Sequence, residues 1–167
     1  QPDGSYTAPV NFPNTLTLTA GLYTLTTPQG LKTNFNASGQ ISSMVYPNGI
    51  TVAYGYTGGD LTTISNGLGR TLTLSYTSGR LSGVTDGTGR SVSYTVDGSA
   101  NLTKFTDANS KDHTYEYDQP GRLIKHFEPA FPAVPFVTNV YDSLSRIMTQ
   151  ADPYGHVSSL YAAGSRS

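Results

Sequence analysis

The chain has 167 residues, with 10 Lys and Arg against 11 Asp and Glu, 18 Gly, 12 Tyr and no Cys. The near-neutral balance gives no general field to attract nucleic acid or anionic lipid, and the missing cysteines exclude disulfides and Cys-ligated metal sites. No apolar run approaches the ~20 residues that a spanning helix needs. Only 13% of the residues are charged, about half the usual share, and the Thr, Ser, Gly, Asn and Tyr that replace them favour strands and turns.

Residues 1–34 predict Thr- and Asn-rich strands with only a weak repeat. Asp3 and Lys32 are the only charged residues among the first 59. The N-terminus lacks a basic region followed by an apolar stretch, so it does not resemble a signal peptide. Both ends of the sequence, including a short tail at 162–167, resemble internal segments of a longer chain.

Residues 35–161 show tandem units with a period of about 20–21 residues. Three series share this period. The apolar series is Ile41, Leu61, Leu81, Leu102, Leu123 and Ile147; the turn series is Gly49, Gly69, Gly89 and Ser110; the aromatic series is Phe35, Tyr56, Tyr76, Tyr94, Tyr117, Tyr141 and Tyr161. Three interleaved series with one period indicate repeats rather than biased composition.

Each unit reads as a β-hairpin. Apolar residues and hydroxyls alternate in stretches such as 71–76, which is the period of a strand with one packed and one wet face. We therefore predict an all-β fold of about 12 to 14 strands, in tandem antiparallel hairpins. A sheet this wide normally curls, splits or closes, so we expect a curled or spiralling sheet, as in a β-solenoid or a segment of a shell wall. Its unpaired edges point to a larger assembly.

A Pro-rich insertion at 127–136 breaks the period. Pro129, Pro132 and Pro135 exclude a regular paired strand. Two interpretations remain open. The insertion is either an ordered apolar loop that covers the sheet or a neighbouring layer, with Phe131 or Val134 packed, or a tolerated insertion at a hairpin tip.

Two segments carry a family resemblance. Tyr117-Asp118-Gln-Pro-Gly121-Arg122-Leu123 and Tyr141-Asp142-Ser-Leu-Ser-Arg146-Ile147 resemble the Rhs/YD-repeat family, and the likeness extends over roughly residues 30–161. In similar proteins the repeats form a strip that spirals into a hollow shell. In polymorphic-toxin systems and insecticidal toxin complexes the shell encloses a toxic domain, whereas teneurin-like proteins use a related barrel in adhesion.

The resemblance implies a structural, non-enzymatic segment that encapsulates or presents an effector domain outside this chain. Its implied partners are flanking repeats and that domain, and its implied location is secreted or at the cell surface, through a bacterial export apparatus.

The alternative is a carbohydrate-binding or adhesion module. Its candidate stacking surface is Tyr54, Tyr56, Tyr76, Tyr94, Tyr117 and Tyr141, since sugars bind apolar ring faces beside polar groups. The structural interpretation of the same residues is an aromatic ladder between strands.

A second set of residues is assigned to turns and pairing. Glycines supply positive φ, aspartates cap turn N–H groups, and arginines bridge to carboxylates or carbonyls of the next unit. The set is Gly79, Arg80, Asp86, Gly89, Arg90, Asp118, Gly121, Arg122, Asp142 and Asp152.

We predict no catalytic residue, cofactor or metal. Asp152-Pro153 is the only Asp-Pro pair, whereas an aspartyl mechanism needs two carboxylates. His126 precedes Glu128 by two residues and His113 follows an aspartate, but the spacings of these histidines and of His156 fit no zinc signature. No nucleophile-elbow context supports a Ser-His-Asp arrangement.

Overall fold

The computed structural model describes residue 9 and residues 11–160, and in this part all regular elements are β-strands. No helix of the described part is long and apolar enough to cross a membrane. The predicted all-β class is confirmed. The fifteen described strands are β1 (Thr15–Thr19), β2 (Leu22–Thr26), β3 (Lys32–Phe35), β4 (Ile41–Val45), β5 (Thr51–Thr57), β6 (Asp60–Ser65), β7 (Thr71–Thr77), β8 (Arg80–Thr85), β9 (Ser91–Val96), β10 (Leu102–Thr106), β11 (Asp112–Gln119), β12 (Arg122–Phe127), β13 (Val137–Tyr141), β14 (Ile147–Ala151) and β15 (Val157–Ser159).

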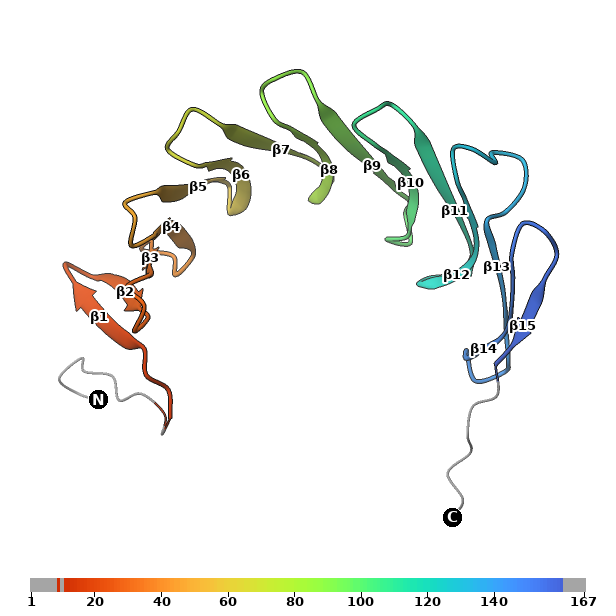
Figure 1. Ribbon diagram of the computed structural model, residues 1–167, viewed down its shortest axis with the longest axis horizontal. Helices are drawn as coiled ribbons and strands as arrows, with labels where there is room; N and C mark the ends of the chain where they lie inside the picture. Colours follow the sequence, from red (N-terminus) through yellow and green to blue (C-terminus); the bar gives the residue numbers. More distant parts are fainter. Residues whose placement is uncertain (1–8, 10, 161–167) are drawn as a thin grey trace, which may run out of the picture. The chain divides into compact units, whose positions relative to one another are not determined.

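The strands follow one another in chain order in one antiparallel sheet (Figure 1). The described part holds slightly more strands than the expected 12 to 14, because the weakly repetitive N-terminal region also forms a hairpin. There, β1 pairs with β2 from Thr15↔Thr26 to Thr19↔Leu22. The tandem-hairpin architecture predicted from the sequence is thus the observed one.

One sequence repeat corresponds to two strands. The apolar series occupies the first or second position of β4, β6, β8, β10, β12 and β14, and the aromatic series from Phe35 to Tyr141 lies on β3, β5, β7, β9, β11 and β13. Tyr161 and the 162–167 tail lie outside the described residues. The same is true of most of the N-terminus, residues 1–8 and 10.

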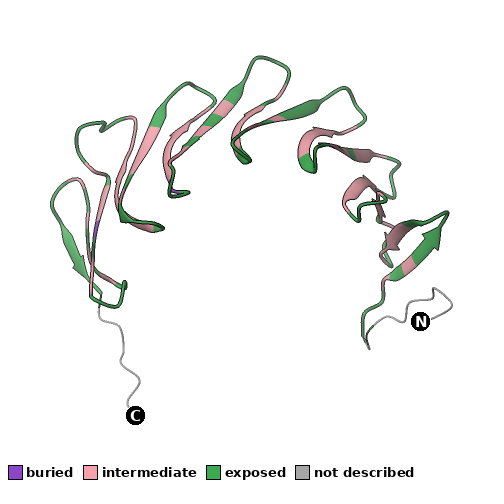
Figure 2. Cartoon of the chain, turned by 180° about the vertical axis from the view of Figure 1, so that it is seen from behind, coloured by how far each residue is buried: buried purple, intermediate pink, exposed green. Residues whose placement is uncertain are grey.

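The chain forms two compact units, residues 1–74 with 85–89 and residues 75–84 with 90–167. Within each unit, the described strands contact only the strands beside them in sequence. Such a sheet leaves its side chains half-buried (Figure 2). Among the described residues no apolar side chain is fully buried, and the two buried residues are polar, Asn101 and Asn139, each 7% exposed. The described part of neither unit therefore contains a hydrophobic core of its own.

Candidate functional site

Nine of the fourteen connections between the described strands are five-residue loops, and seven of these loops are closed by two backbone hydrogen bonds. The N–H of the first residue donates to the carbonyl of the fifth, as from Asp107 to Lys111 at 2.9 Å, and the N–H of the fourth donates to the carbonyl of the first. The fourth residue has positive φ, which glycine adopts without steric cost. This explains the turn series, whose φ angles are +85° at Gly49, +85° at Gly69, +98° at Gly89 and +59° at Ser110.

A side-chain oxygen reinforces six of these loops. The Oδ1 atom of the first residue accepts hydrogen bonds from the N–H groups of the third and fifth residues, as at Asp142, where the distances are 2.9 and 3.0 Å. The six loop-initiating residues are Asn36, Asn66, Asp97, Asp107, Asp142 and Asp152. The Oδ1 of Asp86 likewise accepts from the N–H of Thr88 at 2.9 Å.

These bonds stabilise the charged form of the carboxylates. The backbone N–H of Asn101 lowers the pKa of Asp97, and the N–H of Arg146 does the same for Asp142. The pKa of Asp152 is lowered first by the side chain of His156, whose Nδ1 lies 2.7 Å from Oδ2. Asp152 is the first residue of a five-residue turn.

Shorter turns carry the predicted glycines and arginines. Gly79 and Gly121 have φ of +73° and +75°. Arg80 follows the first and donates from Nη1 to the carbonyl of Asp97 in the next hairpin, at 3.2 Å.

Arg122 makes a two-point contact with Asp118. Nε and Nη2 donate to the two carboxylate oxygens at 2.8 and 2.7 Å, and this pairing lowers the pKa of Asp118 and raises that of Arg122. Nη1 also donates to Ser145 Oγ in the next hairpin, at 3.2 Å. Asp118 lies in strand β11, next to the turn between β11 and β12. Arg90 follows Gly89 at the start of β9.

Sequence reasoning missed the buried amides that tie neighbouring hairpins together. The Oδ1 of Asn101 accepts from the N–H of Gly121, twenty residues along the chain, at 2.7 Å. Asn139 Nδ2 donates to the carbonyl of Leu123 at 3.1 Å. Asn101 could have been found, because the position before each member of the apolar series is always polar: Gln40, Asp60, Arg80, Asn101, Arg122 and Arg146.

The six candidate tyrosines are half-buried on odd-numbered strands. The hydroxyls of Tyr56 and Tyr141 donate to the carbonyls of Ile41 and Leu123, at 2.9 and 2.7 Å. These are bonds within the sheet, between one strand and another. The remaining members are Tyr54, whose hydroxyl lies 3.3 Å from the sulfur of Met44, Tyr76 on β7, Tyr94 on β9 and Tyr117 on β11.

A groove of about 630 Å³ lies over β10 to β12 and the loop before β10, and two of the predicted residues line it. Its lining includes Tyr117 and Asp118, together with Asp97, Asn101 and Tyr115. Burial raises the pKa values of both tyrosines. Ring faces beside carboxylate and amide groups are a surface suited to polar, ring-containing ligands.

An aromatic ladder crosses β9 to β12, and two of its five rings are histidines. The rings of Tyr94 and Phe105 stack with centroids 5.4 Å apart, Phe105 lies 5.5 Å from His113, and His113 lies 6.1 Å from His126. The ring of Tyr115 stacks on His126 at 4.9 Å. Of the six candidate tyrosines, Tyr94 belongs to this ladder.

The Pro-rich insertion reaches the end of this ladder. Phe127 still belongs to β12, and residues 128–136 form the loop to β13. The N–H of Phe136 donates to the carbonyl of His126 at 2.8 Å, and its ring meets the His126 ring edge-on at 6.2 Å. Phe131, Val134 and Phe136 are all exposed, at 41%, 45% and 42%, and Phe136 contacts the sheet through the edge of the His126 ring.

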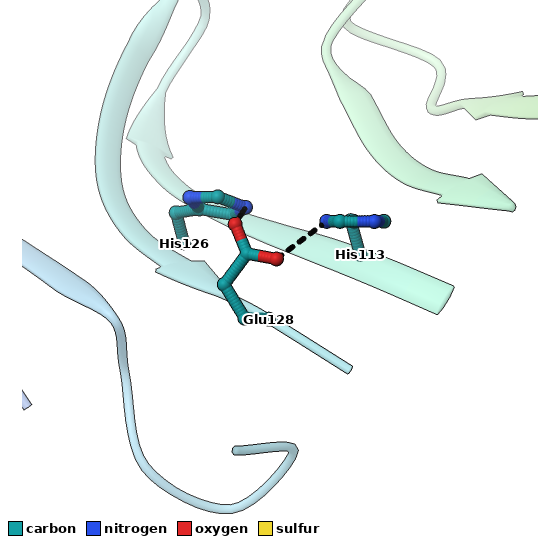
Figure 3. A group of neighbouring side chains, drawn as sticks. All are labelled: His113, His126 and Glu128. Carbon is teal, nitrogen blue, oxygen red and sulfur yellow. Dashed lines mark ion pairs between the residues drawn. The ribbon is translucent and has the colours of Figure 1, made fainter. Parts of the chain in front are cut away.

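The structure also brings together His113, His126 and Glu128 (Figure 3). Glu128 Oε2 lies 3.0 Å from His113 Nδ1, and Glu128 Oε1 lies 3.3 Å from His126 Nε2. His156, the third histidine of the sequence, instead pairs with Asp152. Chain spacing alone did not reveal this convergence, because the three residues meet through strand pairing.

Comparison with known proteins gives a fold likeness. No protein-family model and no curated protein sequence matches the chain. Among solved structures, it is similar to the Tc holotoxin pore of Photorhabdus luminescens, with 16% identity, a TM-score of 0.58 and 78% of this chain covered. It is also similar to a TcdB2–TccC3 crystal structure without the hypervariable C-terminal region, with 16% identity, a TM-score of 0.53 and 78% covered.

These likenesses span only 8% and 9% of the matched chains. At this identity they show a shared fold and nothing further. The present chain therefore corresponds in fold to a small part of much longer polypeptides.

Proposed function

We propose that this chain is a wall segment of an Rhs-type shell, which encapsulates or presents a toxin or effector domain outside the chain. The observation that carries the proposal is the lack of a hydrophobic core in the described part of either unit. A sheet face gains stability by packing against another layer, and repeats gain it from their neighbours. A segment whose strands contact only adjacent strands is suited to a wall continued by further repeats.

The proposed mechanism is physical enclosure, without catalysis. Hydrogen bonds between hairpins would keep the wall closed: Arg80 to Asp97, Asn101 to Gly121 and Arg122 to Ser145. Each joins one repeat to the next near the same end of the hairpins, in addition to the strand ladder. The proposal places the protein in a secreted or cell-surface toxin assembly, with flanking repeats and an effector domain as partners.

Expression of the coding region together with its flanking sequence tests this role. Cryo-electron microscopy should show further hairpin repeats on both sides of these residues. Limited proteolysis should not cleave a following domain as long as the repeats around it remain folded. A double variant of the hairpin ties, Asn101→Ala with Arg122→Ala, should make that domain more susceptible to protease. Flanking sequence without repeats, or a following domain cleaved as fast in the parent as in the variant, would contradict the role.

A second candidate function is glycan binding in the groove over β10 to β12. The observation in its favour is the combination of Tyr115 and Tyr117 with Asp97 and Asp118 in one lining. Binding on a glycan array that is lost in Tyr117→Ala and kept in Tyr54→Ala would support it. An array without signal would remove this candidate and leave the shell role untouched.

A further inference from the structure

We propose that His113, His126 and Glu128 form a binding site for a divalent transition-metal ion of the Zn²⁺ type. The site would clip the Pro-rich loop to strands β11 and β12. This inference does not depend on the shell role, because it rests on three side chains and the hairpin that carries them.

Hairpin register brings the three donors to one face of the sheet. His113 lies seven residues before Pro120, and Glu128 lies seven residues after Gly121. The observed pairs Thr114↔Phe127 and Tyr115↔His126 continue this symmetry. Because side chains alternate between the two faces of a strand, His113 projects on the same side as Tyr115, and Glu128 on the same side as His126.

The donor atoms face one another. Figure 3 shows a nitrogen of each imidazole directed toward the other ring, with the Glu128 carboxylate beside the space between them. The three donor atoms all lie within 4.8 Å of one another. Ligands at about 2.0–2.2 Å from a tetrahedral zinc ion are about 3.3–3.6 Å apart. Small side-chain rotations are therefore enough to close the site around an ion.

His126 Nε2 lacks a hydrogen-bonding partner. This nitrogen is buried and makes no hydrogen bond, although Glu128 Oε1 is 3.3 Å away. Buried polar atoms are nearly always satisfied, and an exception calls for an explanation such as an ion. A metal ion between the two imidazoles would engage this lone pair and place the carboxylate as the third ligand.

The donor chemistry selects the kind of ion. Two imidazole nitrogens and one carboxylate oxygen suit zinc and similar transition metals, whereas magnesium and calcium prefer oxygen ligands. With three protein ligands, a fourth position is left for water. All three side chains are partly exposed, so an ion can enter from solvent.

The surroundings hold the ligands in place. The His126 ring is stacked on Tyr115 at 4.9 Å and meets the edge of Phe136 at 6.2 Å. On the far side, Phe105 lies 5.5 Å from His113. Glu128 is the first residue of the loop between β12 and β13, so the segment that breaks the repeat also supplies the third ligand.

Isothermal titration calorimetry of the untagged chain with ZnCl₂ alone tests the site. We expect one ion per chain with a dissociation constant on the order of 1 µM. Glu128→Gln keeps the size of the side chain but removes its charge, and it should weaken binding about tenfold or more. His113→Gln should have a similar effect, and circular dichroism will show that both variants keep their strands.

The matched control is His156→Gln. His156 also pairs with a carboxylate, Asp152, at 2.7 Å, but its side chain is 82% exposed and it belongs to no three-donor group. Binding should be unchanged in this variant. Titration with Co²⁺ should give visible absorption bands of a low-coordinate site in the parent and not in Glu128→Gln. Affinity for Zn²⁺ that is absent, or equal in the parent and Glu128→Gln, would overturn the proposal.

Discussion

The loops at residues 36–40 and 97–101 have the same backbone but opposite side-chain hydrogen bonding. In the first loop, Asn36 donates its amide to Gln40 Oε1 at 3.1 Å, and Gln40 donates its own amide to the carbonyl of Gly59 at 2.9 Å. In the second, Asn101 donates to Asp97 Oδ2 at 3.1 Å and accepts from the N–H of Gly121 at 2.7 Å. In both loops the fifth residue thus joins its loop to the short turn of the next hairpin.

The reversal follows from the first residue of each loop. An amide can donate as well as accept, whereas a carboxylate only accepts. Asp97 therefore requires Asn101 to present its NH₂ group, which leaves the Asn101 oxygen for an N–H. Asn36 donates instead, which leaves the Gln40 NH₂ group for a carbonyl. One loop geometry can serve two polarities, provided that the first and fifth residues change together.

A second difference separates the same regions. The fourth loop residue is glycine at positions 39, 49, 69 and 89, but Ala100, Ser110 and Ser145 adopt positive φ, of +68°, +59° and +60°, in the later loops. The loops that begin at Asp97, Asp107 and Asp142 therefore combine a charged first residue with backbone strain at the fourth residue, whereas the Asp152 loop has Gly155 there.

The largest expected effect is at Asn101. Asn101→Ala removes a buried acceptor and leaves the N–H of Gly121 without its partner, so we expect the free energy of unfolding to fall by about 1–3 kcal/mol. Gln40→Ala removes an exposed bond that water can replace, with an expected loss of about 0.5–1 kcal/mol. Urea unfolding followed by circular dichroism measures both. Equal losses of stability in the two variants would show that burial does not make the Asn101 hydrogen bond stronger than the Gln40 hydrogen bond.

Backbone strain gives the next effect. Gly69→Ala should lower the free energy of unfolding by about 1–2 kcal/mol, because its φ is +85° and left-handed conformations disfavour side chains. A Cβ there would meet nothing within 4 Å, so no steric contact contributes. Ser110→Gly should raise the free energy of unfolding by up to about 1 kcal/mol, because glycine relieves the strain of a positive φ. The greater entropy of glycine in the unfolded chain offsets part of this gain. Thermal melting of both variants provides the measurement. A Ser110→Gly variant that is less stable than the parent would contradict the proposed backbone strain at Ser110.

The smallest effect is a dependence on pH confined to the carboxylate loops. The folded-state pKa values of Asp107 and Asp142 lie below the ordinary value of 3.8, chiefly because backbone N–H groups of Lys111 and Arg146 donate to them. Their contribution to stability is complete above pH 3.8 and is lost as the pH falls through the lower folded pKa values. The Asn36 and Asn66 loops have no such dependence.

The double variant Asp107→Asn with Asp142→Asn tests this dependence. Asparagine can still accept both backbone N–H bonds, as Asn36 and Asn66 do. Urea midpoints between about pH 6 and pH 2 should therefore decline less steeply in the variant than in the parent. The same acid decline in both proteins would assign the pH dependence to other groups.

Sequence reasoning located the turns better than the contacts between them. The Gly49, Gly69, Gly89 and Ser110 series was visible because positive φ selects glycine at each repeat. The bond from Gly121 to Asn101 was not visible, since it joins residues from different hairpins. The Tyr series was also visible, but the hydrogen-bond partners of its hydroxyls were not. The hydroxyl of Tyr141 donates to the carbonyl of Leu123, which lies eighteen residues earlier in the chain on the neighbouring strand.

The sequence by itself determined an all-β chain of tandem hairpins with few charges, because strand alternation and turn chemistry are local and recur every 20–21 residues. Only the tertiary structure decided that His113 and His126 face Glu128, and that Asn101 and Asn139 are the buried residues of the described part. The physical reason is register. A shift of one residue, such as the bulge between Glu116 and Tyr117, changes which side chains face one another, and local preferences do not specify it.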